Sequence, residues 1–135
     1  YSVETSDDRL ERIKSGTLWE KIASYSRSVR KGNQIWISGT TATHRGRLIG
    51  GNDPAAQTHF VIDIVEGLLK SYGASLDDVV RTRLYIKDID KWEPIAQAHG
   101  ERFRDIMPAN TLVQARLVGK EYLVEIEVDA VMKEE

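Results

Sequence analysis

Residues 122–132 read YLVEIEVDAVM, an alternation of apolar and acidic side chains that predicts a β-strand. Successive side chains of a strand point to opposite faces, so Val124, Ile126 and Val128 share one face, while Glu125 and Glu127 share the other. One face of this strand is therefore suited to a hydrophobic core, and the other carries a row of negative charge.

Residues 77–87 predict a second two-faced strand. Val80, Leu84 and Ile86 are expected on the apolar face, whereas Arg81 and Arg83 lie on the opposite one. The sheet should then have a polar face with acids on one strand and bases on another. Such a face is either exposed to solvent or lines a contact between subunits, and an oligomer fits the second interpretation.

Two predicted helices are long enough to cover the apolar face. Asp53 and Pro54 suit a helix start, and Gly73 suits its end. The apolar stripe between them consists of Val61, Ile64, Val65, Leu68 and Tyr72. Asp90 is expected to cap the second helix, which Pro108 closes. Its stripe consists of Trp92, Ile95, Ala96, His99, Phe103 and Ile106.

The remaining segments complete a mixed sheet. Residues 26–30 and 34–41 predict a hairpin, with Gly32-Asn33 supplying the turn. Residues 43–51 form a loop with a short strand at 47–49, and residues 111–117 form a strand before the last one. An N-terminal segment, 1–21, has one short strand around residues 12–14, and residues 22–135 form a single α+β domain.

Composition narrows the function. The 135 residues carry a net charge of −2, which favours neither nucleic acid nor anionic lipid as a partner. The absence of cysteine excludes disulfides, thiolate catalysis and zinc–thiolate sites. No apolar run approaches the roughly 20 residues that span a bilayer. We expect a cytoplasmic protein with no nucleic-acid or membrane partner.

The histidines and the basic residues of the first hairpin give only weak evidence for a metal site or a ligand pocket. His44, His59 and His99 are not paired at metal-ligand spacing, so no metal is expected. His99 lies on the apolar stripe of the second helix, where a hydrogen-bonded core residue is the favoured interpretation and a role in a pocket is the alternative. Arg27 and Arg30 lie on the predicted hairpin and are expected to face solvent.

Several short motifs, taken in order, resemble the Rid family, also called YjgF and in older usage L-PSP. They are Ile37-Ser38-Gly39, Ala56-Gln57-Thr58, residues 73–80 (GASLDDVV), residues 85–88 (YIKD) followed by Trp92, Pro108-Ala109, and residues 124–127 (VEIE). Each motif is weak alone, but their shared order over residues 22–131 is a strong signal. The periodicity gives the same order of elements independently.

This resemblance implies a chorismate-mutase-like fold that assembles as a homotrimer, with the sheets forming an inner barrel and the helices outside. Three clefts between subunits would bind a small molecule. Well-known members hydrolyse reactive imines and enamines to a carbonyl compound and ammonia, without cofactor or metal.

The resemblance also implies site residues. Glu125 corresponds to the family's glutamate, Ser38 to its serine and Tyr25 to its tyrosine, whereas Asn110 stands directly after Pro108-Ala109 where the family has an arginine. Losing a charge-assisted bond should weaken carboxylate binding about ten-fold or more unless another cation compensates. The candidates for compensation are Arg83, Arg116 and His99.

Each of these roles has a purely structural alternative. Glu125 is as well explained by an ion pair with Arg81 or Arg83 as by catalysis, and Ser38 is more often a hydrogen-bonding residue at a strand end. The favoured function is imine or enamine hydrolysis with a non-standard substrate, and the alternative is a non-catalytic trimer that binds a small metabolite. An RNA-directed function is disfavoured by the acidic charge balance.

Overall fold

A seven-stranded sheet dominates the computed structural model, which describes residues 1–6 and 10–133. The strand order is β1-β2-β3-β4-β9-β7-β8, and neighbours are antiparallel except for the parallel pair β7–β8. The strands are β1 (Glu4–Thr5), β2 (Glu11–Ile13), β3 (Ser28–Lys31), β4 (Gln34–Thr40), β7 (Val79–Ile86), β8 (Ala109–Gln114) and β9 (Val124–Val131). A separate small hairpin pairs β5 (Thr43–His44) with β6 (Arg47–Leu48).

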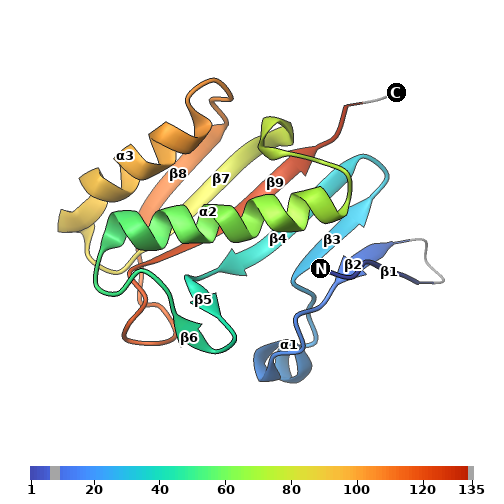
Figure 1. Ribbon diagram of the computed structural model, residues 1–135, viewed down its shortest axis with the longest axis horizontal. Coiled ribbons are helices and arrows are strands. Elements are labelled where there is room, and N and C mark those ends of the chain that lie inside the picture. The colour runs from blue at the N-terminus through green and yellow to red at the C-terminus, as the bar shows by residue number, and fades with distance from the viewer. Residues whose placement is uncertain (7–9, 134–135) are drawn as a thin grey trace.

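Both long helices, α2 (Pro54–Ser71) and α3 (Trp92–Phe103), lie on the same face of the sheet (Figure 1). The predicted start of α2 is confirmed, because the Asp53 carboxylate accepts hydrogen bonds from the backbone N–H groups of Ala55 and Ala56. Gly73 has a φ of +81° after the helix, as its predicted role requires. The buried arc is wider than the predicted stripe and includes Ile62, because α2 packs against both the sheet and α3.

The start of α3 differs from the prediction. Asp88, not Asp90, acts as the cap, and its carboxylate opens a 3₁₀ turn, η2 (Ile89–Lys91), that leads into the helix. Trp92 is 51% exposed, so its predicted place on the buried stripe is wrong. Helical side chains lean toward the helix N-terminus, and a residue at the first position therefore reaches beyond the packed part of the helix.

The two faces of the sheet are as different as the sequence predicted. Along β9 every second residue is buried, and Glu125, Glu127 and Asp129 lie on the opposite side. In β7 the prediction fails at one point, because an irregularity between Val79 and Arg81 buries Val79 and leaves Val80 exposed. An extra residue in a strand reverses the parity of what precedes it, which no local pattern reveals.

The N-terminal segment is more structured than expected. It forms β1, β2 and a short helix, α1 (Leu18–Ala23), and β2 pairs with β3 so that Ile13 is fully buried in the core. The predicted boundary between residues 21 and 22 stays a prediction. The hairpin of β3 and β4 is confirmed, with Gly32 at a φ of +61° in its turn.

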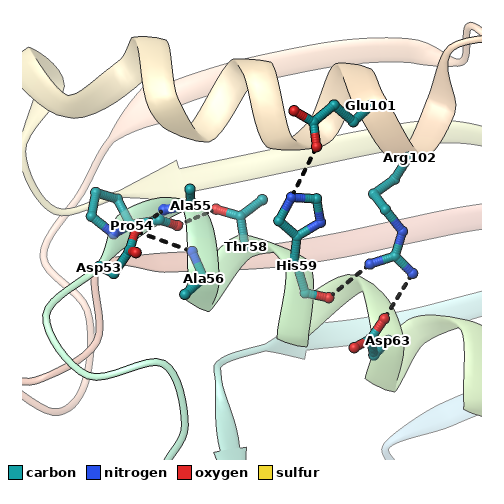
Figure 2. Close-up of polar contacts among 9 residues, drawn as sticks. All are labelled: Asp53, Pro54, Ala55, Ala56, Thr58, His59, Asp63, Glu101 and Arg102. Atoms are coloured by element: carbon teal, nitrogen blue, oxygen red, sulfur yellow. Dashed lines mark hydrogen bonds and ion pairs between the residues drawn. The ribbon is translucent and has the colours of Figure 1, made fainter.

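A polar clamp joins the two long helices (Figure 2). Arg102 of α3 forms an ion pair with Asp63 of α2 at 2.8 Å and donates a hydrogen bond to the carbonyl oxygen of His59 at 3.0 Å. The His59 ring lies 3.2 Å from the carboxylate of Glu101. These contacts fix α3 beside α2 above β7 and β8. None of the helices in residues 1–6 and 10–133 is both long and apolar enough to span a membrane.

Candidate functional site

Glu125 of β9 lies directly against the backbone of Gly39 in β4. A β-carbon built on Gly39 would lie 2.9 Å from both Cδ and Oε2 of Glu125, so only glycine leaves room for the carboxyl group in this position. The approach follows from the register, because the β4–β9 pairing shifts between Ile37 and Thr40. The Ile37-Ser38-Gly39 motif therefore has a structural role, because the Gly39 backbone is the surface against which the Glu125 carboxyl group packs. We call this surface the glycine shelf.

The buried glutamine of α2 fixes the start of the same strand. Gln57 is fully buried, and its amide donates to the carbonyl oxygens of Gly51 at 2.8 Å and Glu121 at 3.0 Å. Its own oxygen accepts the backbone N–H of Leu123 at 2.9 Å. Gln57 thus anchors the segment that leads into Glu125.

Burial raises the pKa of the Glu125 carboxyl group, the guanidinium of Arg27 opposes this by lowering it, and the nearby Glu127 raises it again. A carboxyl group with a raised pKa exchanges protons more readily near neutrality than an exposed one. The alternative interpretation of Glu125, an ion pair with Arg81 or Arg83, is not found between these described residues. Arg83 instead contacts Asp129 at 3.3 Å and Glu127 at 3.9 Å.

Arg27 corrects the expectation that the bases of the first hairpin face solvent. The side chain is partly buried, its Nη2 donates to the carbonyl oxygen of Gly39, and its Nε is buried with no hydrogen-bond partner within the described part of the chain. Ser28 points to the helices, where it hydrogen-bonds Tyr72, so the preceding residue faces the opposite side. The sequence carries little signal for this placement, because it depends on how β3, β4 and β9 are paired.

Ser38 and Tyr25 lie near this shelf on the chain but differ in their contacts. The Ser38 hydroxyl donates to the carbonyl oxygen of Ser26 at 2.7 Å, which matches the strand-end interpretation of this residue. Tyr25 is 38% exposed and borders a surface depression of about 510 Å³, together with Glu20 and Ser26. Both remain candidates for substrate binding.

Asn110 lies on the other side of the sheet from Glu125. Its Nδ2 donates to Oγ1 of Thr82 at 2.9 Å, and the same oxygen lies 2.8 Å from Nε2 of His99. Burial lowers the pKa of His99, and a neutral ring can accept a hydrogen bond from the Thr82 hydroxyl. His99 is thus a hydrogen-bonded residue on the side of α3 that faces the sheet. Within one chain it is not a partner of the glutamate.

Arg116 is also placed away from Asn110. The strand β8 ends at Gln114, short of the predicted end at residue 117, so Arg116 lies outside the strand. It borders a surface depression of about 560 Å³ together with two further bases, Lys87 and Lys120. Asn110 is at the opposite end of β8, so strand parity does not bring the two side chains together.

The geometry therefore brings together the Glu125 carboxyl group, the Gly39 backbone and the Arg27 guanidinium on the open face, by which we mean the sheet surface opposite α2 and α3. The sequence predicted Glu125 as a site residue and missed Arg27. This arrangement can hold a small anion and activate a water molecule beside it.

Comparison with known proteins shows the family and supports the fold. The family described as Endoribonuclease L-PSP matches residues 17–132. A RutC family protein of Pyrococcus abyssi is 32% identical over 111 residues, covering 81% of this chain and 87% of its own. The 3-aminoacrylate deaminase RutC of Acinetobacter baylyi is 29% identical over 106 residues, covering 78% and 84%.

A solved structure indicates the same family and the same fold. The crystal structure of a YjgF/YER057c/UK114 family member from Mycobacterium tuberculosis is 37% identical to this chain, with a TM-score of 0.82 over 91% of this chain and 99% of that one. Both the family match and the fold cover most of the chain. The protein belongs to the YjgF family, also known by the names RutC and L-PSP.

Proposed function

We propose that this protein hydrolyses a small imine or enamine to a carbonyl compound and ammonia. The observation that carries the proposal is the Glu125 carboxyl group, whose pKa burial raises and which lies against Gly39 on the open face. A carboxyl group so placed can take a proton from an attacking water molecule and return it to the leaving nitrogen.

The chemistry needs only this group and water. As the water oxygen bonds to the imine carbon, Glu125 accepts its proton and the C=N electron pair moves to nitrogen, which is protonated. The resulting carbinolamine expels ammonia as its hydroxyl becomes a carbonyl. An enamine enters the same route after protonation on carbon.

The proposal includes a homotrimer that encloses the open face. Large apolar side chains stand exposed there among the charges: Trp36 is 40% exposed and Val113 is 42% exposed. Burying such side chains against another subunit is favourable at roughly 25 cal/mol per Å² of apolar surface. Sedimentation equilibrium or native mass spectrometry should give three times the 15.3 kDa of the chain, and a monomer at micromolar concentration would contradict the assembly.

Small carboxylates are the proposed substrates. One relative is named a 3-aminoacrylate deaminase, and 3-aminoacrylate carries an enamine next to a carboxylate. Short 2-imino acids have the same two groups in a similar spacing. We therefore expect turnover of 3-aminoacrylate or of a 2-imino acid such as 2-iminobutyrate.

The direct test generates 2-iminobutyrate, 2-iminopropionate or 3-aminoacrylate enzymatically in the assay and follows its loss. The wild-type protein should accelerate the loss of at least one above the rate in buffer. E125Q should remove the acceleration, whereas E4Q, at an exposed position in β1, should retain it. Equal rates for wild type and E125Q would refute the assignment of Glu125.

A second candidate function has its own supporting observation. Asn110 is uncharged and is hydrogen-bonded to Thr82, so the position that holds an arginine in the family offers no cation here. A trimer that binds a metabolite without turning it over fits this feature. Saturable binding of a keto acid without any imine hydrolysis would favour this function over the first.

A further inference from the structure

An anionic substrate at Glu125 needs a cation, and none of the three predicted candidates supplies one within the chain. Arg83 lies within ion-pair distance of two carboxylates, those of Glu127 and Asp129. Arg116 lies beyond the end of β8, and His99 of α3 contacts Thr82 on the other face of the sheet. The cation must come from elsewhere.

Arg27 has the required position and is not neutralised by an ion pair. Its one side-chain hydrogen bond goes to the neutral carbonyl oxygen of Gly39, and no carboxylate of residues 1–6 or 10–133 lies within 4 Å of it. Its charge nevertheless acts on Glu125, where it lowers the pKa against the effect of burial. An arginine near a carboxyl group but not paired with it can still take up a second anion.

The surroundings of Arg27 explain why it stays unpaired. Burial raises the pKa of Glu20 of α1, but hydrogen bonds from Ser15 and Thr17 lower it, and the charge of Arg27 lowers it further. The Glu20 carboxylate is thus already bound by Ser15 and Thr17. Burial raises the pKa of Tyr1, and the charge of Arg27 lowers it. The guanidinium is therefore held in place by a backbone carbonyl, with its charge available.

We propose that Arg27 binds the carboxylate of the substrate and replaces the arginine that is absent at position 110. This inference rests on the proposed function and names its substrate class. Arg27 donates a hydrogen bond to the carbonyl oxygen of Gly39, and the Glu125 carboxyl group lies against the same residue. The two side chains therefore meet at Gly39. A small substrate held by both groups would carry its C=N carbon close to its carboxylate, as a 2-imino acid does.

Two substitutions and a matched control test the proposal. R27Q removes the charge and keeps a hydrogen-bond donor, and R27K keeps the charge but loses the planar fork. R30Q is the control, because Arg30 lies three residues further along, in β3, but bonds the carbonyl oxygen of Gly32 at 2.8 Å and pairs with Glu11 at 3.7 Å. Circular dichroism and sedimentation establish that each variant is folded and assembled.

Binding is measured with 2-oxobutyrate, an unreactive keto acid, and with its neutral amide. R27Q should weaken binding of the keto acid ten-fold or more and leave the amide unchanged, R27K should retain part of the affinity, and R30Q should match wild type. In turnover, R27Q should raise KM more than it lowers kcat. It should also move the acidic limb of the pH–rate profile to higher pH, because the charge that lowers the pKa of Glu125 is gone.

The two proposals can fail separately. If wild type binds 2-oxobutyrate but turns over no imine, and R27Q loses that binding, the role of Arg27 stands and the catalytic proposal fails. Equal keto-acid affinity for wild type and a folded R27Q overturns the role of Arg27, whether or not imines are hydrolysed. Failure of the wild-type protein to bind 2-oxobutyrate at millimolar concentration overturns it as well.

Discussion

Nδ2 of Asn110 donates a hydrogen bond to Oγ1 of Thr82 at 2.9 Å, on the face of the sheet that the helices cover. Thr82 is fully buried, and its hydroxyl continues the chain of hydrogen bonds to Nε2 of His99. Asn110, which the family resemblance places at the position of an arginine, thereby stabilises the packing of α3. The charge for substrate binding is then left to another part of the chain.

Thr82→Val should destabilise the protein. Valine keeps the shape but removes the hydroxyl, so Asn110 and His99 both lose a partner beneath α3. A loss of about 1–3 kcal/mol in the free energy of unfolding is expected, measured by chemical denaturation. T111V on the exposed side of β8 is the control and should stay within about 0.5 kcal/mol of wild type.

Gly39→Ala should impair function more than stability. The added β-carbon would meet the carboxyl group of Glu125 at 2.9 Å and force that side chain to move. We expect kcat to fall at least ten-fold in the imine assay. Gly100→Ala in α3, where a β-carbon meets no atom within 4 Å, should leave turnover unchanged. An active G39A would show that the position of Glu125 against Gly39 is not needed.

Glu125→Gln should raise stability at neutral pH. The folded protein raises the pKa of this carboxyl group, so it holds the proton more tightly than the unfolded chain does. Wild type therefore loses stability as the pH rises from about 4.3, the ordinary glutamate value, through the raised pKa of the folded state. The gain in E125Q should be present at pH 8 and vanish near pH 4, as read from denaturation midpoints.

Arg102→Met should loosen the contact between the two long helices. It removes the ion pair with Asp63 and the hydrogen bond to the His59 carbonyl oxygen, while methionine retains much of the apolar stem (Figure 2). The expected cost is about 1–2 kcal/mol of unfolding free energy. Lys70→Met removes an exposed pair with Glu66 at 3.8 Å and should cost less than about 0.5 kcal/mol. Equal effects of the two substitutions would contradict the clamp.

Local patterns predicted the elements well where the pattern was long. The stripe of α2, the alternation of β9 and the turn at Gly32 were all readable because each depends on neighbours within a few residues. The predicted cap before α3 was the wrong aspartate. Asp88 and Asp90 are equally good capping residues, and only the η2 turn selects between them.

The sequence by itself determined a two-faced sheet with two covering helices, and a glutamate on the uncovered face. Hydrophobic periodicity is enough for this, because it states which side of each element avoids water. Only the tertiary structure decided which groups meet: the shifted register of β4 sets Gly39 beneath Glu125, and pairing of distant strands brings Arg27 to the same place. Register and bulges depend on the packing of the whole sheet, and so no single segment encodes them.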